Sequence, residues 1–373
     1  LGKYPKPMLK FNSKHFIQYI LNNTSKYNFR RIIILCGYRH KIFFQKYHNK
    51  IINFTKVLCL KEKKLLGTGG ALINLKKLNV KDFILVNGDT IFDIDLNSLF
   101  STLDKNQIGT VALIQSKNQK SKKLNKLVLR NNKVEIKKNS TLMNGGVYYF
   151  KKDIFKYIKK KLSLEDAVLP KLINKNKING KTFNNFFIDI GSEYYLKIAA
   201  SKLRKHFTRP AIFLDRDGVI NYDYGHVYKY KDFKFKKGVL KGLKFLIKKN
   251  YRIFIVTNQA GIGKGIYTEN KLIKLHKKIK EELQKINIFF DDVQYSPYHP
   301  NAKIKKYKKR SSTRKPGNKM IEDIKLNWDL DLKKSFMIGD KITDKFAAEK
   351  SKIKFFYTKD NFFKLVNQIT NSY

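Results

Sequence analysis

The stretch Asp215-Arg216-Asp217-Gly218-Val219-Ile220-Asn221 directly follows the apolar run Ala211-Ile212-Phe213-Leu214. A short apolar run bounded by polar residues predicts a strand buried on both faces, as in a parallel sheet. Alternate residues of a strand point the same way, so Asp215 and Asp217 are expected to share one site at the strand tip. Two acids there can act as nucleophile and proton donor, although many acidic pairs at strand ends only cap a helix or line a turn.

Three later segments strengthen the catalytic interpretation: two place polar residues at the end of a predicted strand, and one supplies cations. Residues 252–256 and 335–338 are predicted buried strands that lead into a hydroxyl, amides and a third acid, and a pair of cations lies between them. Hydroxyls, amides and cations hold phosphate oxygens, and a further carboxylate can complete a magnesium site. The polar residues concerned are Thr257, Asn258, Arg314, Lys315 and Asp340.

From about residue 210 onward, the sequence resembles the haloacid-dehalogenase superfamily. It is most similar to the branch of D-glycero-D-manno-heptose 1,7-bisphosphate 7-phosphatases and histidinol phosphatases. The motif Asp-Arg-Asp-Gly-Val-Ile-Asn is typical of that branch, and residues 258–265 match its second motif. The resemblance implies that Asp215 is the nucleophile, forming an aspartyl-phosphate, and that Asp217 is the general acid and base.

The same resemblance implies the remaining roles in this half. Thr257, Asn258 and Lys315 are expected to bind phosphate and Arg314 to hold the substrate. Asp340 is expected to bind Mg²⁺ together with Asp215 and the Asp217 carbonyl. The family commonly carries a small zinc loop with cysteine and histidine ligands, but here the matching positions read Ser-Pro-Tyr at 296–298 and Ser-Ser-Thr at 311–313. No cysteine follows Cys59, so we expect no zinc.

The first half of the chain is expected to form a separate domain, since 373 residues exceed the usual size of a single core. The polar and basic stretch 201–209 precedes Pro210, and it places the predicted domains at 1–205 and 206–373. Apolar runs alternate with helix-length segments upstream of it. We therefore predict two Rossmann-like, three-layer α/β domains. The runs expected to be strands in the first domain are 32–35, 57–60, 83–86, 111–114 and 147–150.

Four signals in the first half can carry chemistry. Lys6 lies between two prolines that fix the local backbone, and residues 66–71 form a glycine-rich turn. Asp89 follows a predicted strand, and Asp189 follows the apolar pair Phe187-Ile188. Two acids far apart in the sequence can share one magnesium ion.

This set resembles the sugar-1-phosphate nucleotidyltransferases, most closely the heptose-1-phosphate and mannose-1-phosphate guanylyltransferase-like group, and implies a mixed sheet of that type. By this resemblance Lys6 binds phosphate, Gly67 and Gly69 lie against the nucleobase of GTP or ATP, and Asp89 and Asp189 hold Mg²⁺. Contacts to the sugar are implied for Asn144, Gly145 and Glu165.

The first half departs from this family at its start. The family opens with a strand and a Gly-Gly-x-Gly-Thr-Arg loop, whereas this sequence begins after that loop, at Leu1-Gly2-Lys3-Tyr4. Either the sequence is a fragment or its transferase half is degenerate, and we favour the fragment because Lys6, Asp89 and Asp189 are all present. As written, the chain is expected to be an intact phosphatase and a poor transferase.

The two resemblances support each other, because a 7-phosphatase acting on heptose 1,7-bisphosphate yields the heptose 1-phosphate that a transferase would take. The expected function is therefore a magnesium-dependent phosphatase fused to a heptose-1-phosphate nucleotidyltransferase, acting in nucleotide-activated heptose biosynthesis. The alternative in the same class is a histidinol-phosphate or other small phosphomonoester phosphatase fused to a mannose-1-phosphate guanylyltransferase-like domain. Anomer preference, GTP against ATP and oligomeric state stay open.

A formal net charge of +51 raises an alternative of another class, a nucleic-acid-binding protein on an inactive enzyme scaffold. Only ten of the 80 basic residues are arginine, which nucleic-acid recognition favours, and the lysines are scattered along both halves. We therefore expect solvated lysine faces and no nucleic-acid partner. No apolar run is long enough to span a bilayer and no signal peptide is visible, so we expect a cytoplasmic protein without a membrane partner.

Overall fold

The computed structural model describes residues 4–62, 64, 66–100, 106–115, 127–137, 140–159 and 161–372. The chain forms two compact units. Unit 1 comprises Leu1–Ile20, Ile33–Asn49 and Val57–Ala200, and unit 2 comprises Leu21–Ile32, Lys50–Lys56 and Ser201–Tyr373. The chain therefore enters unit 2 twice before its second half begins. The division at 205 and 206 predicted from the sequence stays a prediction.

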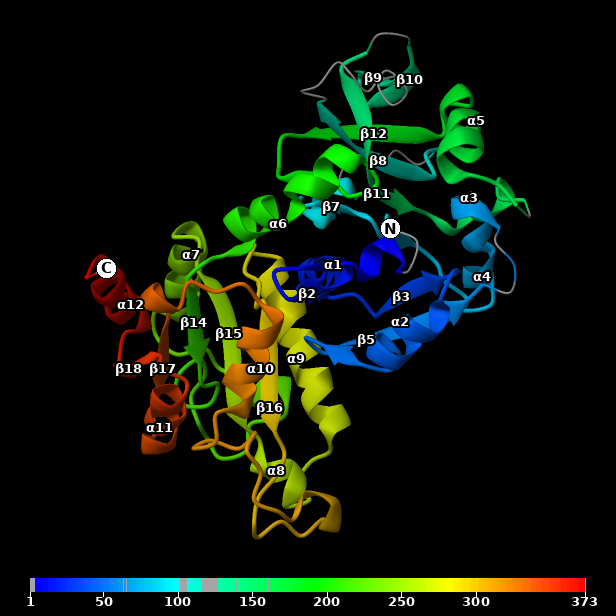
Figure 1. The fold of residues 1–373 in the computed structure, drawn as a ribbon. Helices are drawn as coiled ribbons and strands as arrows, with labels where there is room; N and C mark the ends of the chain where they lie inside the picture. The colour runs from blue at the N-terminus through cyan, green and yellow to red at the C-terminus, as the bar shows by residue number, and fades with distance from the viewer. Residues whose placement is uncertain are drawn as a thin grey trace. The chain divides into compact units, whose positions relative to one another are not determined.

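Unit 2 is built on a five-stranded parallel sheet in the order β16-β15-β14-β17-β18 (Figure 1). The three predicted strands of this half are confirmed in β14, β15 and β17. The strands are β14 (Ala211–Leu214), β15 (Arg252–Asn258), β16 (Asp292–Ser296), β17 (Phe336–Gly339) and β18 (Lys354–Tyr357). The helices are α7 (Val239–Lys248), α8 (Ala260–Gly263), α9 (Glu269–Gln284), α10 (Lys319–Asn327), α11 (Ile342–Lys350) and α12 (Phe362–Asn371).

Both faces of this sheet are covered, which explains the unbroken apolar runs. Ile212 and Leu214 of β14 pack in a core cluster with side chains of α7, α9 and α12. Ala211 and Phe213, which point to the opposite face, pack with side chains of α10 and α11. The result is the three-layer arrangement expected for this half.

The segment 268–286 is predicted to be an amphipathic helix that buries residues 272, 275, 279, 283 and 286 on one face, and its residues 269–284 form α9. Thr268 caps the helix by accepting a hydrogen bond from the Lys271 amide. The apolar residues at 272, 275, 279 and 283 are buried, as expected, whereas Ile286 lies beyond the end of α9 and is exposed. The inclusion of Ile286 in the buried face is therefore wrong, because the helix ends before it.

Unit 1 contains a mixed sheet in the order β6-β11-β8-β12-β10-β9, in which β8 and β12 are parallel and the other pairs antiparallel. The five predicted strands are confirmed in β3, β5, β6, β8 and β11, although β3 and β5 belong to a separate three-stranded sheet with β4. The strands are β3 (Arg31–Cys36), β4 (Ile51–Ile52), β5 (Thr55–Lys61), β6 (Phe83–Val86), β7 (Thr90–Phe92), β8 (Gly109–Gln115), β9 (Leu127–Arg130), β10 (Lys133–Ile136), β11 (Leu142–Phe150), β12 (Ile178–Phe183) and β13 (Phe187–Asp189).

The first 207 residues also supply six α-helices and a short hairpin among the described residues. The helices are α1 (Phe16–Ser25), α2 (His40–Tyr47), α3 (Gly67–Ala71), α4 (Ile73–Lys76), α5 (Leu169–Asn174) and α6 (Glu193–Phe207), and the hairpin strands are β1 (Lys10–Phe11) and β2 (Lys14–His15). In the described part of the chain, no helix has the length and apolarity that crossing a membrane requires.

Candidate functional site

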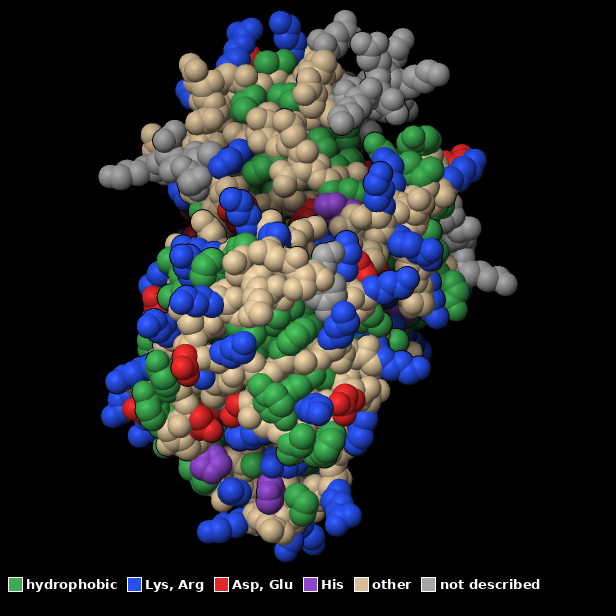
Figure 2. Space-filling view, turned by 90° about the vertical axis from the view of Figure 1, so that its left-hand side faces the viewer, with side chains coloured by type: hydrophobic (Ala, Val, Ile, Leu, Met, Phe, Trp, Pro, Cys, Tyr) green, Lys and Arg blue, Asp and Glu red, His purple; other side chains and the backbone are tan. Residues whose placement is uncertain are grey.

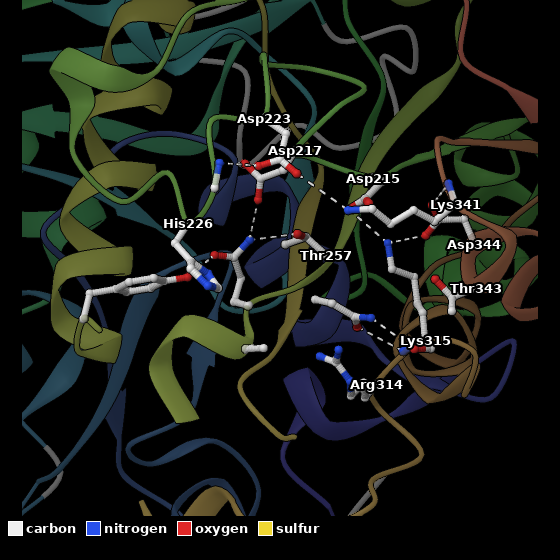
Figure 3. A pocket seen from close by; sticks show the side chains of 15 residues that line it. Asp215, Asp217, Asp223, His226, Thr257, Arg314, Lys315, Lys341, Thr343 and Asp344 are labelled. Carbon is white, nitrogen blue, oxygen red and sulfur yellow. Dashed lines mark hydrogen bonds and ion pairs between the residues drawn. The ribbon is translucent and has the colours of Figure 1, made fainter. Parts of the chain in front are cut away.

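The carboxyl end of β14 carries a buried ion-pair cluster. Lys315 Nζ lies 2.9 Å from Asp215 Oδ1 and 2.6 Å from Asp344 Oδ1, and it donates to the Val256 carbonyl at 2.8 Å. In Figure 3 the side chains of Asp215, Lys315 and Asp344 point toward one another. Parallel strands β14, β15 and β17 end at the same edge of the sheet, so the cluster joins residues that are far apart in the sequence.

Burial sets the protonation behaviour of this cluster. It raises the pKa of Asp215 to about 6, because loss of solvent outweighs the attraction of Lys315. Burial alone would lower the pKa of Lys315, but the charges of Asp215 and Asp344 outweigh it, and this pKa is raised. Lys315 therefore remains a cation beside the expected nucleophile, where it can hold a phosphate oxygen.

Asp217 is held by a dense set of donors. Arg216 donates from Nη2 to both carboxylate oxygens, at 2.9 and 2.8 Å, and from Nε to Oδ1 at 3.1 Å. The side-chain amides of Asn221 and Gln259 each donate at 3.0 Å. Burial raises the pKa of Asp217, but Arg216 and the other donors outweigh it, so this pKa is lowered. The sequence motif indicated Asp217 but not the role of Arg216 or Gln259.

Three carboxylates form a group that fits a divalent cation. Ligand atoms of Asp215, Asp340 and Asp344 all lie within 4.8 Å of one another. Asp340 Oδ1 is buried and has no hydrogen-bond partner among the described residues, and burial raises the pKa of this carboxyl group. Carboxylate oxygens are the ligands that Mg²⁺ prefers, so the donor set suits that ion. Asp340 was a predicted metal ligand, whereas Asp344 was not assigned as one.

Gly218 allows the backbone to pass close to Asp340. Its φ is +86°, and a Cβ at this position would lie 2.5 Å from Asp340 Oδ2. Gly265 provides a matched control away from the site, since its φ is +77° but a Cβ there would meet nothing within 4 Å. Both conformations favour glycine.

We expect Gly218→Ala to lose most phosphatase activity, because it displaces the Asp340 carboxylate. Gly265→Ala should cost only the left-handed strain, about 1–2 kcal/mol, with activity retained. Denaturant unfolding and steady-state phosphate release measure the two effects. If Gly218→Ala kept as much activity as the control variant, the close approach of residue 218 to Asp340 would not matter for catalysis.

A cavity of about 320 Å³ opens beside these residues. The predicted phosphate and substrate ligands line this cavity, so the structure brings them together (Figure 3). They are Thr257, Asn258, Arg314 and Lys315. The Asn258 amide group is hydrogen-bonded to the main chain of Lys315, at 3.1 and 3.0 Å. It therefore holds the loop that carries Lys315 in place. Arg314 Nη1 donates to the Tyr298 carbonyl at 3.3 Å. The assignment of individual ligands to phosphate stays a prediction.

The positions that match the family's zinc loop carry hydroxyl groups that bind one another. Thr313 Oγ1 lies 3.0 Å from Ser296 Oγ and 2.9 Å from Ser311 Oγ. Hydroxyl groups therefore stand at the positions where the family has cysteine thiolates, and their hydrogen bonds join residue 296 to residues 311–313. Structural zinc is bound mainly by cysteine sulfur and histidine nitrogen, so this donor set does not fit it.

Unit 1 brings its two predicted acids together. The Ile190 amide donates to the Asp89 carbonyl at 3.0 Å, and Asp189 pairs with Thr90 across β13 and β7. A Cβ on Gly191 would lie 2.8 Å from Asp189 Oδ1 and 3.5 Å from Asp89 Oδ2, so both carboxylates lie next to the same backbone position. Burial raises the pKa of Asp189, and Lys6 Nζ lies 3.9 Å from Asp89 Oδ2.

A second network in unit 1 surrounds Glu165. Thr68 donates to Glu165 Oε2 at 2.7 Å, and Tyr148 donates to Oε1 at 3.4 Å. Asn144 donates to the Tyr148 hydroxyl at 2.5 Å, so Tyr148 connects the predicted sugar ligands Asn144 and Glu165. Sequence reasoning missed Tyr148, because an aromatic residue in a buried strand usually only fills the core. Gly145 packs so closely on Phe92 that a Cβ would lie 2.4 Å from its ring.

The glycine-rich turn packs on the chain near Leu162. Gly67 has a φ of +75°, and a Cβ on it would lie 2.8 Å from the Leu162 carbonyl oxygen. The Gly69 amide donates to the same oxygen at 2.9 Å. The expected contact of Gly67 and Gly69 with a nucleobase stays a prediction.

These two units define the class of the protein: a phosphoric monoester hydrolase of the haloacid-dehalogenase type joined to a nucleotidyltransferase unit. The family model described as nucleotidyl transferase matches residues 2–206, and the model described as polynucleotide kinase 3 phosphatase matches residues 213–371. The chain belongs to the nucleotidyl transferase family and, through its second half, to the family of D-glycero-beta-D-manno-heptose-1,7-bisphosphate 7-phosphatases.

The relatives that carry this second assignment are enzymes of that name. The chain is 41% identical over 144 residues to the one from Photorhabdus laumondii subsp. laumondii, covering 39% of this chain and 77% of the relative. It is 37% identical over 141 residues to the one from Rhodopseudomonas palustris, covering 38% and 78%. The solved structure of HddC from Yersinia pseudotuberculosis is 26% identical, covers 54% of this chain and 91% of its own, and has a TM-score of 0.45.

Proposed function

We propose that unit 2 hydrolyses the 7-phosphate of D-glycero-beta-D-manno-heptose 1,7-bisphosphate. The observation that carries the proposal is the buried cluster of Asp215, Lys315 and Asp344 beside the cavity that Thr257 and Arg314 line. The relatives named for this reaction support the substrate. The geometry supports the chemistry, because a buried carboxylate next to a cation is placed to attack a phosphate.

The proposed reaction has two steps. An Asp215 carboxylate oxygen attacks phosphorus, and the bond from phosphorus to the ester oxygen breaks. Asp217, which must hold a proton for this step although its neighbours lower its pKa, gives that proton to the leaving alkoxide. Water then attacks the aspartyl-phosphate, Asp217 takes a proton from that water, and inorganic phosphate leaves with Asp215 restored. Lys315 and Thr257 hold phosphate oxygens throughout, and the closed network around Asp217 fixes the direction of proton transfer.

We propose that Asp215, Asp340 and Asp344 hold Mg²⁺, with the Asp217 carbonyl as a further ligand. When bound, the ion neutralises negative charge between the nucleophile and the phosphate. The unpaired Asp340 oxygen supports this assignment, since a buried carboxylate oxygen without a partner is costly unless a ligand satisfies it.

For unit 1 we propose transfer of a nucleotide from GTP or ATP to heptose 1-phosphate, the product of unit 2. Asp89 and Asp189 would hold Mg²⁺, Lys6 would bind phosphate, and Asn144, Gly145 and Glu165 would contact the sugar. The convergence of the two acids and the hydrogen-bonded Glu165 network support these roles. Such an enzyme mainly positions its reactants and neutralises charge.

Phosphate release from the two anomers of heptose 1,7-bisphosphate, compared with histidinol phosphate, tests the proposal. We expect the β anomer to have the highest kcat/KM, because the relatives bear that name, and we expect EDTA to abolish turnover and Mg²⁺ to restore it. Asp340→Asn should require a higher Mg²⁺ concentration for half-maximal activity. A preference for histidinol phosphate would overturn the substrate while leaving the mechanism in place.

The alternative of a nucleic-acid-binding protein on an inactive scaffold predicts a different result. On the face shown in Figure 2, Lys and Arg side chains are interspersed with hydrophobic and other residues instead of forming one continuous stripe. Duplex binding that persists at about 200 mM salt, together with no phosphatase turnover, would favour that alternative.

A further inference from the structure

The turn of the β4–β5 hairpin places an aromatic side chain in the core of unit 2. Phe54 is almost fully buried and belongs to the same core cluster as Leu214, the last residue of β14. Its ring stacks on His276 with a centroid distance of 4.5 Å and on Tyr295 at 5.8 Å. A residue from the first sixty positions therefore completes the core of the phosphatase unit.

The backbone at this turn is strained. Asn53 and Phe54 have φ values of 44° and 60°, the left-handed region that a two-residue hairpin turn requires and that favours Asn followed by Gly. A bulky aromatic residue at positive φ is rare and costs about 1–2 kcal/mol. Such strain persists only where the surroundings stabilise it, and here burial and stacking of the Phe54 ring provide the stabilisation.

Buried hydrogen bonds hold the same turn. Asn53 Nδ2 donates to the carbonyls of Phe290 and Asp291, at 2.8 and 3.2 Å. The carbonyl of Asn53 accepts from Lys280 Nζ at 3.0 Å, and Lys280 also donates to the Ser25 carbonyl at 2.7 Å. Lys280 lies one helical turn after His276 on α9, so this helix contacts the hairpin at two successive turns.

His276 connects the turn to the active site. Its Nε2 lies 3.3 Å from Arg216 Nη1. A guanidinium group can only donate, so Nε2 accepts and His276 is neutral. Burial and the nearby charges of Arg216 and Lys280 lower the pKa of His276 well below its usual value, which agrees with that assignment. With this bond, and with Nη2 also donating to the Val227 carbonyl at 2.6 Å, every nitrogen of Arg216 is hydrogen-bonded.

We propose that Phe54 and His276 are positioning residues for the phosphatase reaction: the Phe54 ring fixes the His276 imidazole, which holds Arg216 and thereby aims the Asp217 carboxyl at the leaving oxygen. Neither residue lines the cavity, so both act through Arg216. This inference rests on the proposed role of Asp217 as general acid.

The leaving group provides a test that a purely structural role would not pass. An alkyl phosphate leaves as an alkoxide and needs a proton from Asp217, whereas 4-nitrophenyl phosphate leaves as a stable phenolate and does not. We expect Phe54→Leu and His276→Leu in the full chain to lower kcat/KM on the sugar phosphate by about 10- to 100-fold. On 4-nitrophenyl phosphate kcat/KM should change by less than about threefold, because kcat/KM reports on the steps up to the aspartyl-phosphate, whereas the later attack of water, in which Asp217 acts as base, is the same for both substrates.

Two controls accompany these variants. Phe44 stacks on His48 at 4.8 Å in unit 1, so Phe44→Leu removes a similar ring pair, and it should leave both phosphatase rates unchanged. His276→Gln retains an oxygen that can accept from Arg216, and it should recover much of the rate that His276→Leu loses. The sugar phosphate used is the one that the wild type hydrolyses fastest, so failure of the heptose assignment leaves this test intact.

Equal loss of kcat/KM on both phosphates in Phe54→Leu and His276→Leu would overturn the inference, because it would show general damage to the unit. Unchanged rates on both substrates would overturn it as well. If Phe54→Leu does not fold, the contrast between His276→Leu and His276→Gln decides, since neither substitution alters the hairpin turn.

Discussion

Asp215→Asn is expected to lose at least about 10³-fold in kcat for phosphate release while keeping its fold, because an amide has nearly the same shape as a carboxylate but cannot attack phosphorus. The side chain sits between Lys315 and the main chain at the tip of β14, and an amide oxygen can still accept from Lys315. Steady-state phosphate release measures the loss of activity. Fluorescence of Trp328, the single tryptophan, reports on folding, since it is buried in the core of unit 2.

A matched substitution separates loss of the nucleophile from loss of negative charge. Asp323 lies on α10 in an ion pair with Lys319 and outside the cavity, so Asp323→Asn should keep wild-type kcat. Substantial turnover in Asp215→Asn, with no sign of reversion to aspartate, would contradict a covalent step at this position.

Lys315→Met should have the largest effect on stability. It removes the cation that pairs with Asp215 and Asp344 and leaves both buried carboxylates without it. Removing one partner of a buried ion pair costs about 3–5 kcal/mol. We expect a loss of that size in the free energy of unfolding of unit 2, measured by urea titration with Trp328 fluorescence in the absence of magnesium, together with loss of phosphatase activity.

Two further variants test the cause of that loss. Adding Asp344→Asn to Lys315→Met removes one of the two unpaired charges and should recover part of the stability but no activity. Lys278 forms ion pairs on the surface of α9, so Lys278→Met should leave the free energy of unfolding nearly unchanged. A loss no larger than that of Lys278→Met would show that the buried cluster contributes little to stability.

The sheet of unit 2 and the main acids of its site are predictable from sequence. Unbroken apolar runs mark strands that are covered on both faces, and parallel strands present their carboxyl ends at one edge. Asp215, Thr257 and Asp340 follow from that rule alone, because each lies at the end of such a run. In unit 1 the same reasoning places Asp89 after β6, while Asp189 ends the short strand β13.

Other contributors could not be predicted, because their roles depend on contacts between distant segments. Asp344 lies in a helix, where an acid is usually a cap or a surface residue, and only the fold brings it to Lys315. In the sequence His276 is one polar residue of an amphipathic helix. Its partner Arg216 lies between Asp215 and Asp217 in the motif, where only the two acids suggest a chemical role. Phe54 follows Asn53 at a turn where the preferred residue is glycine, so local propensity gives no sign of its burial.

The discontinuous make-up of unit 2 bears on how such a protein can evolve. Unit 2 includes Leu21–Ile32 and Lys50–Lys56. A gene fission near residue 200 would therefore yield a phosphatase whose core has an exposed apolar cavity where the Phe54 ring had packed. A fission that keeps the phosphatase stable must therefore either retain these two short stretches or fill the vacated space with other side chains.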